Sequence, residues 1–345
     1  MDTLRLRFSV VGIVLAALAL LLLLLMKSGG SDPSSPGGDM PMEELAIGIN
    51  GTLKSAPVVV ALERGFFEEN GVQVQVTIYP SGVAAISALF DGDLDVTAVP
   101  EHVAAFTGLE RGDFRVLAVV NRNTSAEVVG RRDRGIESVA DLEGKRIGLK
   151  KKSSSPYWLN RLLIYNNLSI EDVELVDATP ADLPMMIAEG AVDAVITWHP
   201  YAYDCRKALR DNAYYADAQL GQDMYWLVVG MTGWLDEHPE IVLRYLLALQ
   251  EAVDYINAHP DEAKEIVTQY LGLEREQVDF EWSLYTFRLE LPQSLLLALE
   301  QEARWKIEQM EGEAEMPNYL TFIYFDGLST LAPEAVTIIH EQKEG

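Results

Sequence analysis

Cysteine is almost absent from this sequence: Cys205 is the single one among 345 residues. One thiol excludes an intrachain disulfide and a thiolate-rich metal site, so the fold must be held together by other means. We expect Cys205 to serve as a small buried hydrophobic residue rather than as a reactive group.

Positive charge is also scarce. The chain carries 27 Lys and Arg against 53 Asp and Glu, which gives a formal net charge of −26 at pH 7. Such a surface repels nucleic acid, and no basic stripe with interleaved aromatic residues offsets the repulsion. The composition therefore argues against nucleic acid as a partner. With 49% hydrophobic residues, the chain can fill two cores of ordinary domain size.

Motifs of the common catalytic machineries are missing as well. The chain contains no Gly-x-Ser-x-Gly, no His-Glu-x-x-His, no glycine-rich phosphate loop and no Gly-x-Gly-x-x-Gly. His102, His199 and Glu101 raise the alternative of a transition-metal site, but their spacing is not a local ligand motif. We expect no enzyme activity, no cofactor and no metal.

A long apolar run lies at the N-terminus. Arg5 and Arg7 precede an uncharged, mostly apolar run over 8–26, which Lys27 follows. Its 19 residues exceed the usual signal-peptide core of about 7–15 and approach the roughly 20 that span a bilayer. We predict that 1–27 is a signal peptide or a transmembrane anchor, and the sequence leaves both open. No cysteine follows the run, which excludes a lipoprotein anchor.

Either alternative places the rest of the chain on the periplasmic or extracellular face of the cytoplasmic membrane, with the arginine-bearing end inside. Residues 28–41 consist largely of Gly, Ser, Pro and Asp, with little to bury. We therefore predict a flexible tether over 28–44, between the membrane and the folded body.

The folded part contains a degenerate repeat. Residues 88–96 are echoed by 186–194, with an acid-Gly pair and a later Asp in register, and 47–49 matches 147–149. One α/β unit therefore occurs twice, about a hundred residues apart. Two similar lobes imply a cleft between them, and such clefts are common ligand sites. We expect the repeated Asp95 and Asp193 to be structural turn residues.

Short β-rich runs alternate with helical patterns, which is typical of largely parallel sheets with crossover helices. Beyond Pro239 the pattern becomes helical, and we expect these helices to pack around the first lobe with little functional content. The predicted strands are 44–50, 72–79, 96–99, 116–120, 126–131, 145–149, 173–177, 194–197 and 225–231, the last a return into the first lobe; the predicted helices are 57–70, 81–90, 156–167, 181–189, 241–258 and 293–310.

Ligands of open parallel sheets bind beyond the carboxyl ends of the strands. There the sequence places Ser153, Ser154 and Ser155, directly before Pro156, which suits the first turn of a helix. Free backbone N–H groups, serine hydroxyls and a helix dipole together suit a carboxylate, sulfonate or phosphate. The alternative is that Ser155 is only the N-cap of the helix.

Two turns of the first lobe offer similar groups. Thr52 and Ser55 follow the first predicted strand, and Ser81 with Gly82 opens the helix after the second. Each hydroxyl can face a ligand or can simply cap its helix. Both alternatives stay open from the sequence.

The ends of the repeated strands differ between the lobes. Glu101 follows one strand and can receive an ammonium or amino group. Trp198 ends the counterpart, where an indole can stack on a planar group, although packing in the core is the alternative. Tyr201 lies in the same turn and completes the predicted contact set.

Several short segments occur in an order that resembles a known family. They are 63–67 (Glu-Arg-Gly-Phe-Phe), 70–72, 81–82, 141–148, 189–194, 198–201 and 318–320. Together they resemble the solute-binding proteins of ABC importers for nitrate, sulfonate, taurine and thiamine-pyrimidine precursors, over roughly residues 45–340.

This resemblance implies a type II periplasmic-binding-protein fold, with two α/β lobes joined by two crossover strands. It implies a first lobe formed by 45–124 and 226–345 and a second lobe formed by 125–225. It also implies a small, anionic or pyrimidine-like solute as ligand, and an ABC permease with its ATPase subunit as partners. The ligand contacts would come from the turns at 52–55, 81–82, 100–101, 153–155 and 198.

The sequence departs from the family in two respects. Lys151 and Lys152 replace the more usual glycine-containing turn before the serines, and the cysteine-rich iron motif of a fungal, pyrimidine-forming branch is absent. Two alternatives stay open: an enzyme of the same fold that acts on a pyrimidine-like or small aromatic acid, and a membrane-tethered sensor domain.

Overall fold

The computed structural model describes residues 41–310 and 314–340. The predicted signal peptide or anchor over 1–27 and most of the predicted tether over 28–44 lie outside these residues. The last two residues of that tether already belong to the first strand, β1 (Glu43–Asn50). None of the helices in the described ranges is long and apolar enough to cross a membrane.

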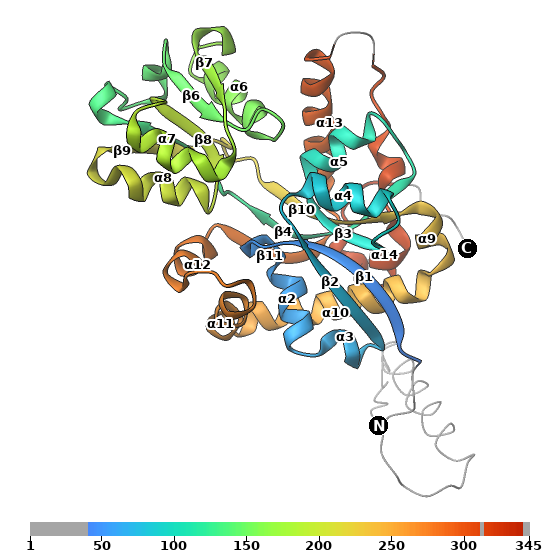
Figure 1. Cartoon of the computed structure of the whole chain (residues 1–345). Coiled ribbons are helices and arrows are strands. Elements are labelled where there is room, and N and C mark those ends of the chain that lie inside the picture. The colour runs from blue at the N-terminus through green and yellow to red at the C-terminus, as the bar shows by residue number, and fades with distance from the viewer. Residues whose placement is uncertain (1–40, 311–313, 341–345) are drawn as a thin grey trace, which may run out of the picture. The chain divides into compact units, whose positions relative to one another are not determined.

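The described strands form two sheets (Figure 1). In the first sheet the order is β11-β4-β10-β3-β1-β2. β1 pairs in parallel with β2 and β3, as helical crossovers require, whereas β10 pairs antiparallel with β3 and β4. The remaining strands of this sheet are β2 (Val72–Tyr79), β3 (Val96–Pro100), β4 (Phe114–Asn123), β10 (Met224–Met231) and β11 (Tyr285–Glu290).

The second sheet repeats this arrangement. Its order is β7-β6-β8-β5-β9, with β6 parallel to β7 and β8, and with β5 antiparallel to β8 and β9. β10 and β5 each pair antiparallel with both of their neighbours, and each is the first strand that the chain forms after it leaves the other sheet. The strands are β5 (Ala126–Arg131), β6 (Arg146–Leu149), β7 (Glu174–Asp177), β8 (Ala194–Trp198) and β9 (Ala213–Asp217).

Two chain segments connect the sheets side by side. β4 runs into β5, and β9 runs into β10. Met224 lies opposite Asn123 in the first sheet, and Asp217 lies opposite Glu127 in the second. The backbone N–H of Ala218 donates to the carbonyl of Ala126 at 3.1 Å between them. The predicted return of the chain into the first sheet is confirmed.

The side chain of Gln219 fastens the two connections to each other. It is fully buried, and its Oε1 accepts a hydrogen bond from the N–H of Ala126 at 2.8 Å. Its Nε2 donates to the carbonyls of Asn123 at 2.9 Å and of Gln222 at 2.8 Å. A buried amide whose donors and acceptor are all bonded fixes the backbone that it touches.

Helices cover the sheets through buried aliphatic side chains (Figure 1). In β5, Val128 packs in a core with α6 (Ser155–Tyr165), and its neighbour Val129 packs on the opposite face with α7 (Leu183–Glu189) and α8 (Tyr201–Leu209). The other described helices are α2 (Ala56–Glu63), α3 (Phe66–Glu69), α4 (Gly82–Phe90), α5 (Glu101–Gly108), α9 (Thr232–Glu237), α10 (Pro239–Ala258), α11 (Pro260–Leu271), α12 (Arg275–Trp282), α13 (Gln293–Glu308) and α14 (Phe325–Leu331).

The sequence repeat corresponds to two equivalent turns. The N–H of Asp95 donates to the carbonyl of Ala46 at 2.9 Å, and its Oδ2 accepts from the N–H of Ala46 at 2.8 Å. In the second sheet, Asp193 makes the same two bonds with Arg146, at 2.9 and 3.0 Å. Each aspartate thus ties the turn before one strand to a neighbouring strand, and its predicted structural role is confirmed.

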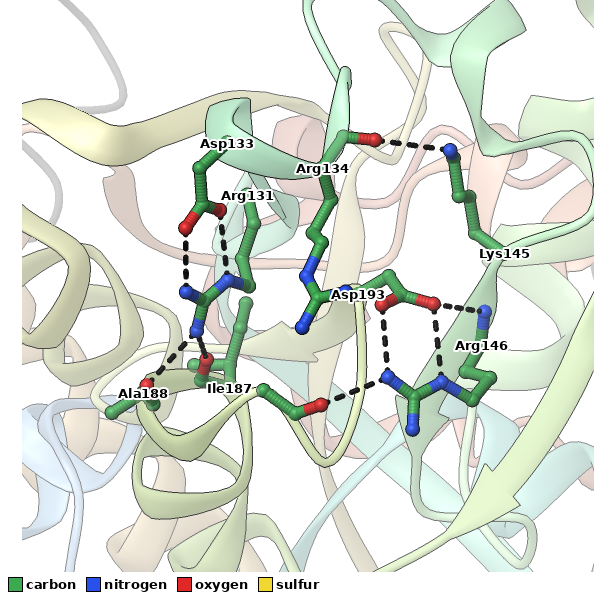
Figure 2. A network of polar contacts seen from close by, with 9 residues as sticks. Arg131, Asp133, Arg134, Lys145, Arg146, Ile187, Ala188 and Asp193 are labelled. Atoms are coloured by element: carbon green, nitrogen blue, oxygen red, sulfur yellow. Dashed lines mark hydrogen bonds and ion pairs between the residues drawn. The ribbon is translucent and has the colours of Figure 1, made fainter.

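Guanidinium groups reinforce the second turn (Figure 2). Arg146 donates to both carboxylate oxygens of Asp193, at 3.0 and 3.2 Å. Arg131 donates to the carbonyls of Ile187 and Ala188 near the end of α7, at 2.6 and 2.9 Å. A cation at a helix C-terminus is stabilised by the helix dipole. All of these contacts lie within the protein and stabilise the turn between α7 and β8.

Three expectations about the elements are wrong. The helix predicted over 57–70 is interrupted at Gly65, which adopts φ +79° and separates α2 from α3. The region after Pro239 is not purely helical, because Tyr285–Glu290 forms the edge strand β11 beside β4. β9 was not expected, since its half-exposed sequence lacks a continuous apolar run.

We predict that Asp193→Ala lowers the free energy of unfolding by about 1–3 kcal/mol, because it removes bonds to a backbone N–H and to a guanidinium. The matched variant is Asp133→Ala, which removes an exposed ion pair with Arg131 and should change stability little. Urea denaturation measures both. An Asp193→Ala protein as stable as the unmodified protein would contradict this role.

Candidate ligand-binding site

The strand registers bring two strand ends to the junction of the sheets. Pro100, at the end of β3, lies opposite Trp226 near the start of β10. Trp198, at the end of β8, lies opposite Ala126 at the start of β5. Because β5 and β10 begin at the two connections, the carboxyl ends of the parallel strands in both sheets meet there. This is the edge at which parallel sheets bind ligands.

Thr52 and Ser55 follow β1 but differ in their partners. The Ser55 hydroxyl donates to the carbonyl of Asn50 at 2.7 Å and accepts from its N–H at 3.2 Å. Its hydrogen is therefore used to close the turn. The Thr52 hydroxyl is buried and has no hydrogen-bond partner among the described residues, so it is the freer of the two.

Ser81 and Gly82 have local roles at the start of α4. The Ser81 hydroxyl accepts a hydrogen bond from the N–H of Ala84 at 3.2 Å, which is an N-cap contact. A Cβ at Gly82 would lie 2.5 Å from Cδ of Pro100, so only glycine lets α4 approach the end of β3. Contact of either residue with a solute stays a prediction.

Ser153, Ser154 and Ser155 are buried at the start of α6. The helix begins at Ser155, one residue earlier than predicted. Ser154 rather than Ser155 is the N-cap, because Pro156 is accommodated at the second helical position. No side chain caps the helix at Ser154. The hydroxyl of Ser153 donates to the carbonyl of Lys150 at 2.7 Å and accepts from the N–H of Ser155 at 3.1 Å. Serine hydroxyls therefore gather at the N-terminus of α6, where Ser153 bonds the first backbone N–H and the N-cap Ser154 makes no side-chain cap bond.

Trp198 and Tyr201 contact each other where β8 ends. Their rings meet edge to face with centroids 6.2 Å apart, and both side chains are half-buried. His199, between them, is fully buried, and its Nε2 lies 3.4 Å from Oε1 of Glu127. Burial lowers the pKa of His102 to about 4. In residues 41–310 and 314–340, no group of three or more His, Cys, Asp and Glu side chains is placed to hold a metal ion.

Glu101 is fully buried where β3 passes into α5. Its Oε2 accepts a hydrogen bond from the N–H of Tyr225 at 3.0 Å, and its Oε1 has no partner among the described residues. Burial raises the pKa of this carboxyl to about 8, although the backbone hydrogen bonds and nearby Lys54 oppose the shift.

Lys54 is a buried cation that the sequence analysis missed. Its Nζ lies 5.8 Å from the ring centroid of Trp226 and 6.0 Å from that of Tyr285. Burial lowers its pKa to about 8, while the nearby Glu281 and Glu101 raise it. The site thus contains a cation whose charge is tuned by two acids. The available signal was a lysine within the mostly apolar segment from Leu53 to Ala61, which the structure buries throughout.

Glu281 and Glu302 are two further buried acids, on α12 and α13. Burial raises the pKa of both, and for Glu302 the neighbouring charge of Glu101 adds to the shift. Both oxygens of Glu302 lack a hydrogen-bond partner among the described residues. The available signal was spacing, since Glu302 falls on the apolar face of α13 defined by Leu295, Ala298 and Leu299.

α12 and α13 contact the second lobe, so the helices beyond Pro239 do not pack around the first lobe alone, as expected; their functional content stays a prediction. Trp305 of α13 packs edge to face on Tyr157 of α6, with centroids 5.8 Å apart. Phe280 of α12 packs against His199 at 5.3 Å. A pocket of about 310 Å³ lies between α6 and α13, lined by Tyr157, Arg161, Gln301, Arg304, Trp305 and Glu308.

The chain matches known proteins in sequence over most of its length. The family model described as NMT1/THI5 like matches residues 52–263. A Bacillus subtilis (strain 168) protein described as aliphatic sulfonates-binding is 27% identical over 274 residues, which cover 77% of this chain and 80% of that protein.

Solved structures share the fold. The periplasmic aliphatic sulphonate binding protein SsuA of Escherichia coli superposes with a TM-score of 0.71 at 18% identity, covering 82% of this chain and 98% of SsuA. The desulfurization enzyme DSZB superposes with a TM-score of 0.61 at 18% identity, covering 85% of this chain and 99% of the enzyme. These structures confirm the predicted periplasmic-binding-protein fold, which occurs in a binding protein and in an enzyme.

We predict that stability falls as the pH rises from about 5 to 8. Between pH 4.5 and 8, Glu101 holds its proton in the folded protein and releases it in the unfolded chain, so folding is favoured at the acidic end. Each carboxyl with a raised pKa lowers the free energy of unfolding by up to about 1.4 kcal/mol per pH unit in this range.

Urea denaturation at several pH values measures this slope. Glu101→Gln should make it shallower, whereas Glu143→Gln, which replaces an exposed glutamate of the second lobe, should leave it unchanged. An identical slope in Glu101→Gln and the unmodified protein would show that Glu101 does not titrate abnormally.

Proposed function

The chain belongs to the NMT1/THI5-like family, and from that membership we propose that it is the extracytoplasmic solute-binding protein of an ABC importer. It would capture a small, anionic organic solute between its lobes and deliver it to a membrane permease. The B. subtilis relative is described as sulfonates-binding, which supports a sulfonate or a related anion as the solute class.

The cluster of buried serines at the start of α6 is the observation that carries the anion assignment. The helix is 11 residues long, and Ser153–Ser155 are buried at its N-terminus, where Ser153 accepts from the N–H of Ser155 and the N-cap Ser154 makes no side-chain cap bond. Backbone N–H groups, hydroxyls and the positive end of the helix dipole favour an anion at that point. Buried Lys54 adds positive charge on the side of the first lobe.

The remaining predicted contacts would shape the organic part of the solute. Trp198 and Tyr201 offer partly exposed rings at the end of β8. Thr52 supplies a free hydroxyl from the opposite lobe, and Ser55, Ser81 and Gly82 would act mainly by holding their turns. We propose that the N-terminal segment targets the protein to the membrane surface where the permease and its ATPase operate.

An enzyme of the same fold that acts on a pyrimidine-like or small aromatic acid is the less favoured alternative. Cys205 is fully buried in α8, and burial raises the pKa of its thiol to about 12. A thiol with such a pKa is neither an ionised nor an accessible nucleophile. The buried carboxyls of the cleft can bind a solute without reacting with it.

Thermal unfolding with a panel of solutes tests the binding function. We expect an alkanesulfonate, an aminosulfonate or a small carboxylate to raise the unfolding temperature of the full-length protein. At a hundred times its Kd, one such ligand stabilises the protein by about 2.7 kcal/mol. No shift with any anion, together with turnover of a panel member seen by mass spectrometry, would favour the enzyme.

The double variant Ser154→Ala, Ser155→Ala tests the anion assignment. We expect its affinity for the best anion of the panel to fall roughly tenfold or more, because hydrogen bonds to a charged group are lost. Isothermal titration calorimetry measures the change. Ser169→Ala is the matched control, since Ser169 bonds only Asp172 at a turn before β7. Equal affinity of the double variant would refute the assignment.

A further inference from the structure

Two buried carboxyl groups lie on neighbouring helices of the first lobe, and the charge of Glu101 acts on Glu302. Glu101 begins α5 and Glu302 lies on α13, which packs along α5, and both residues are fully buried. One oxygen of Glu101 and both oxygens of Glu302 lack a hydrogen-bond partner among the described residues. Leaving such acceptors unpaired costs free energy, more so when they are charged.

The pair faces the second lobe. Trp305 lies three residues after Glu302 and therefore on the same face of α13, and its ring contacts Tyr157 of α6. Among charged groups, Glu302 also has the largest effect on the Tyr157 hydroxyl, raising its pKa beyond the effect of burial. The acids are thus directed toward the junction where β3 and β8 end.

The nearby cations are engaged elsewhere. Arg161 is hydrogen-bonded to Gln222 and lies over the rings of Tyr157 and Trp158. Lys54 lies by the rings of Trp226 and Tyr285. Among the described residues, neither Glu101 nor Glu302 has a Lys, Arg or His nitrogen within the 4.0 Å of an ion pair.

We propose that Glu101 and Glu302 form a subsite for a protonated amine, so that the solute is a zwitterion with an anionic group and an ammonium group. This inference rests on the proposed function, because the anionic group would occupy the start of α6. An ammonium carries three donors, and the unpaired oxygens of the two carboxyl groups supply acceptors for them.

Binding of the amine would release protons. Without a cation the pair holds protons near neutral pH, since burial raises the pKa of Glu101 to about 8 and raises that of Glu302 well above its ordinary value. An ammonium between the carboxyls favours their ionised forms. The other titratable groups that interact with the pair are Lys54, Asp223 and Tyr225 for Glu101 and Arg161, Tyr157 and Tyr319 for Glu302.

Matched solutes with and without the amine test the subsite. The probes are taurine against ethanesulfonate and β-alanine against propionate, titrated calorimetrically into the full-length protein. We expect at least one amine-bearing probe to bind about tenfold or more tightly than its partner. In Glu302→Gln this preference should fall below about threefold, whereas Glu300→Gln on the same helix should retain it.

Proton release gives a second readout that needs no variant. Titrations of the amine-bearing probe at pH 7 in phosphate and in Tris, which differ in ionisation enthalpy, should show release of protons on binding. The desamino partner should release none. Equal affinity for the two members of each pair, or no proton release, would overturn the subsite while leaving anion binding intact. Failure of all four probes and of every other anion to bind would overturn the proposed function itself.

Discussion

A two-stranded antiparallel ribbon runs through both sheets, and the positions of the predicted ligand-binding turns depend on it. β4 and β10 form the ribbon in the first sheet, and β5 and β9 continue it in the second. Where the ribbon passes from one sheet to the other, the Gln219 side chain bonds the backbone of Asn123, Ala126 and Gln222. Because the ribbon leaves each sheet beside the carboxyl ends of the parallel strands, Glu101 and Trp198 reach the same junction from opposite sides.

The two sides of this junction differ in chemistry. The second lobe provides hydroxyls, a helix N-terminus and aromatic rings, all of which suit an anion with an organic body. The first lobe provides buried acids and Lys54, whose ionisation is shifted by burial. The repeat therefore gives the two lobes equivalent strand-and-turn units, in which Asp95 and Asp193 make the same bonds. The lobes differ in the side chains outside these units, which are acids in the first lobe and hydroxyls at a helix N-terminus in the second.

Much of the fold was predictable, because alternation of apolar runs and helical patterns is a local property of the chain. Strands such as Val72–Tyr79 and Ala126–Arg131 fall where the sequence placed them. The site was less predictable, because Lys54 and Glu302 belong to it only through helices that are distant in sequence. In the sequence, each appears only as a charged residue within an otherwise apolar pattern that the structure buries. β11 escaped prediction because its partner β4 lies far upstream in the chain.

The bond between Ala218 and Ala126 has a consequence for the chain topology. All strands of the second sheet lie between these neighbouring points, so the whole sheet is an insertion whose ends meet. Removing it would leave β4 and β10 already paired, as the arms of a hairpin closed by a short turn. The second sheet thus enters the chain as one continuous segment, and the strand order of the first sheet does not depend on what that segment contains.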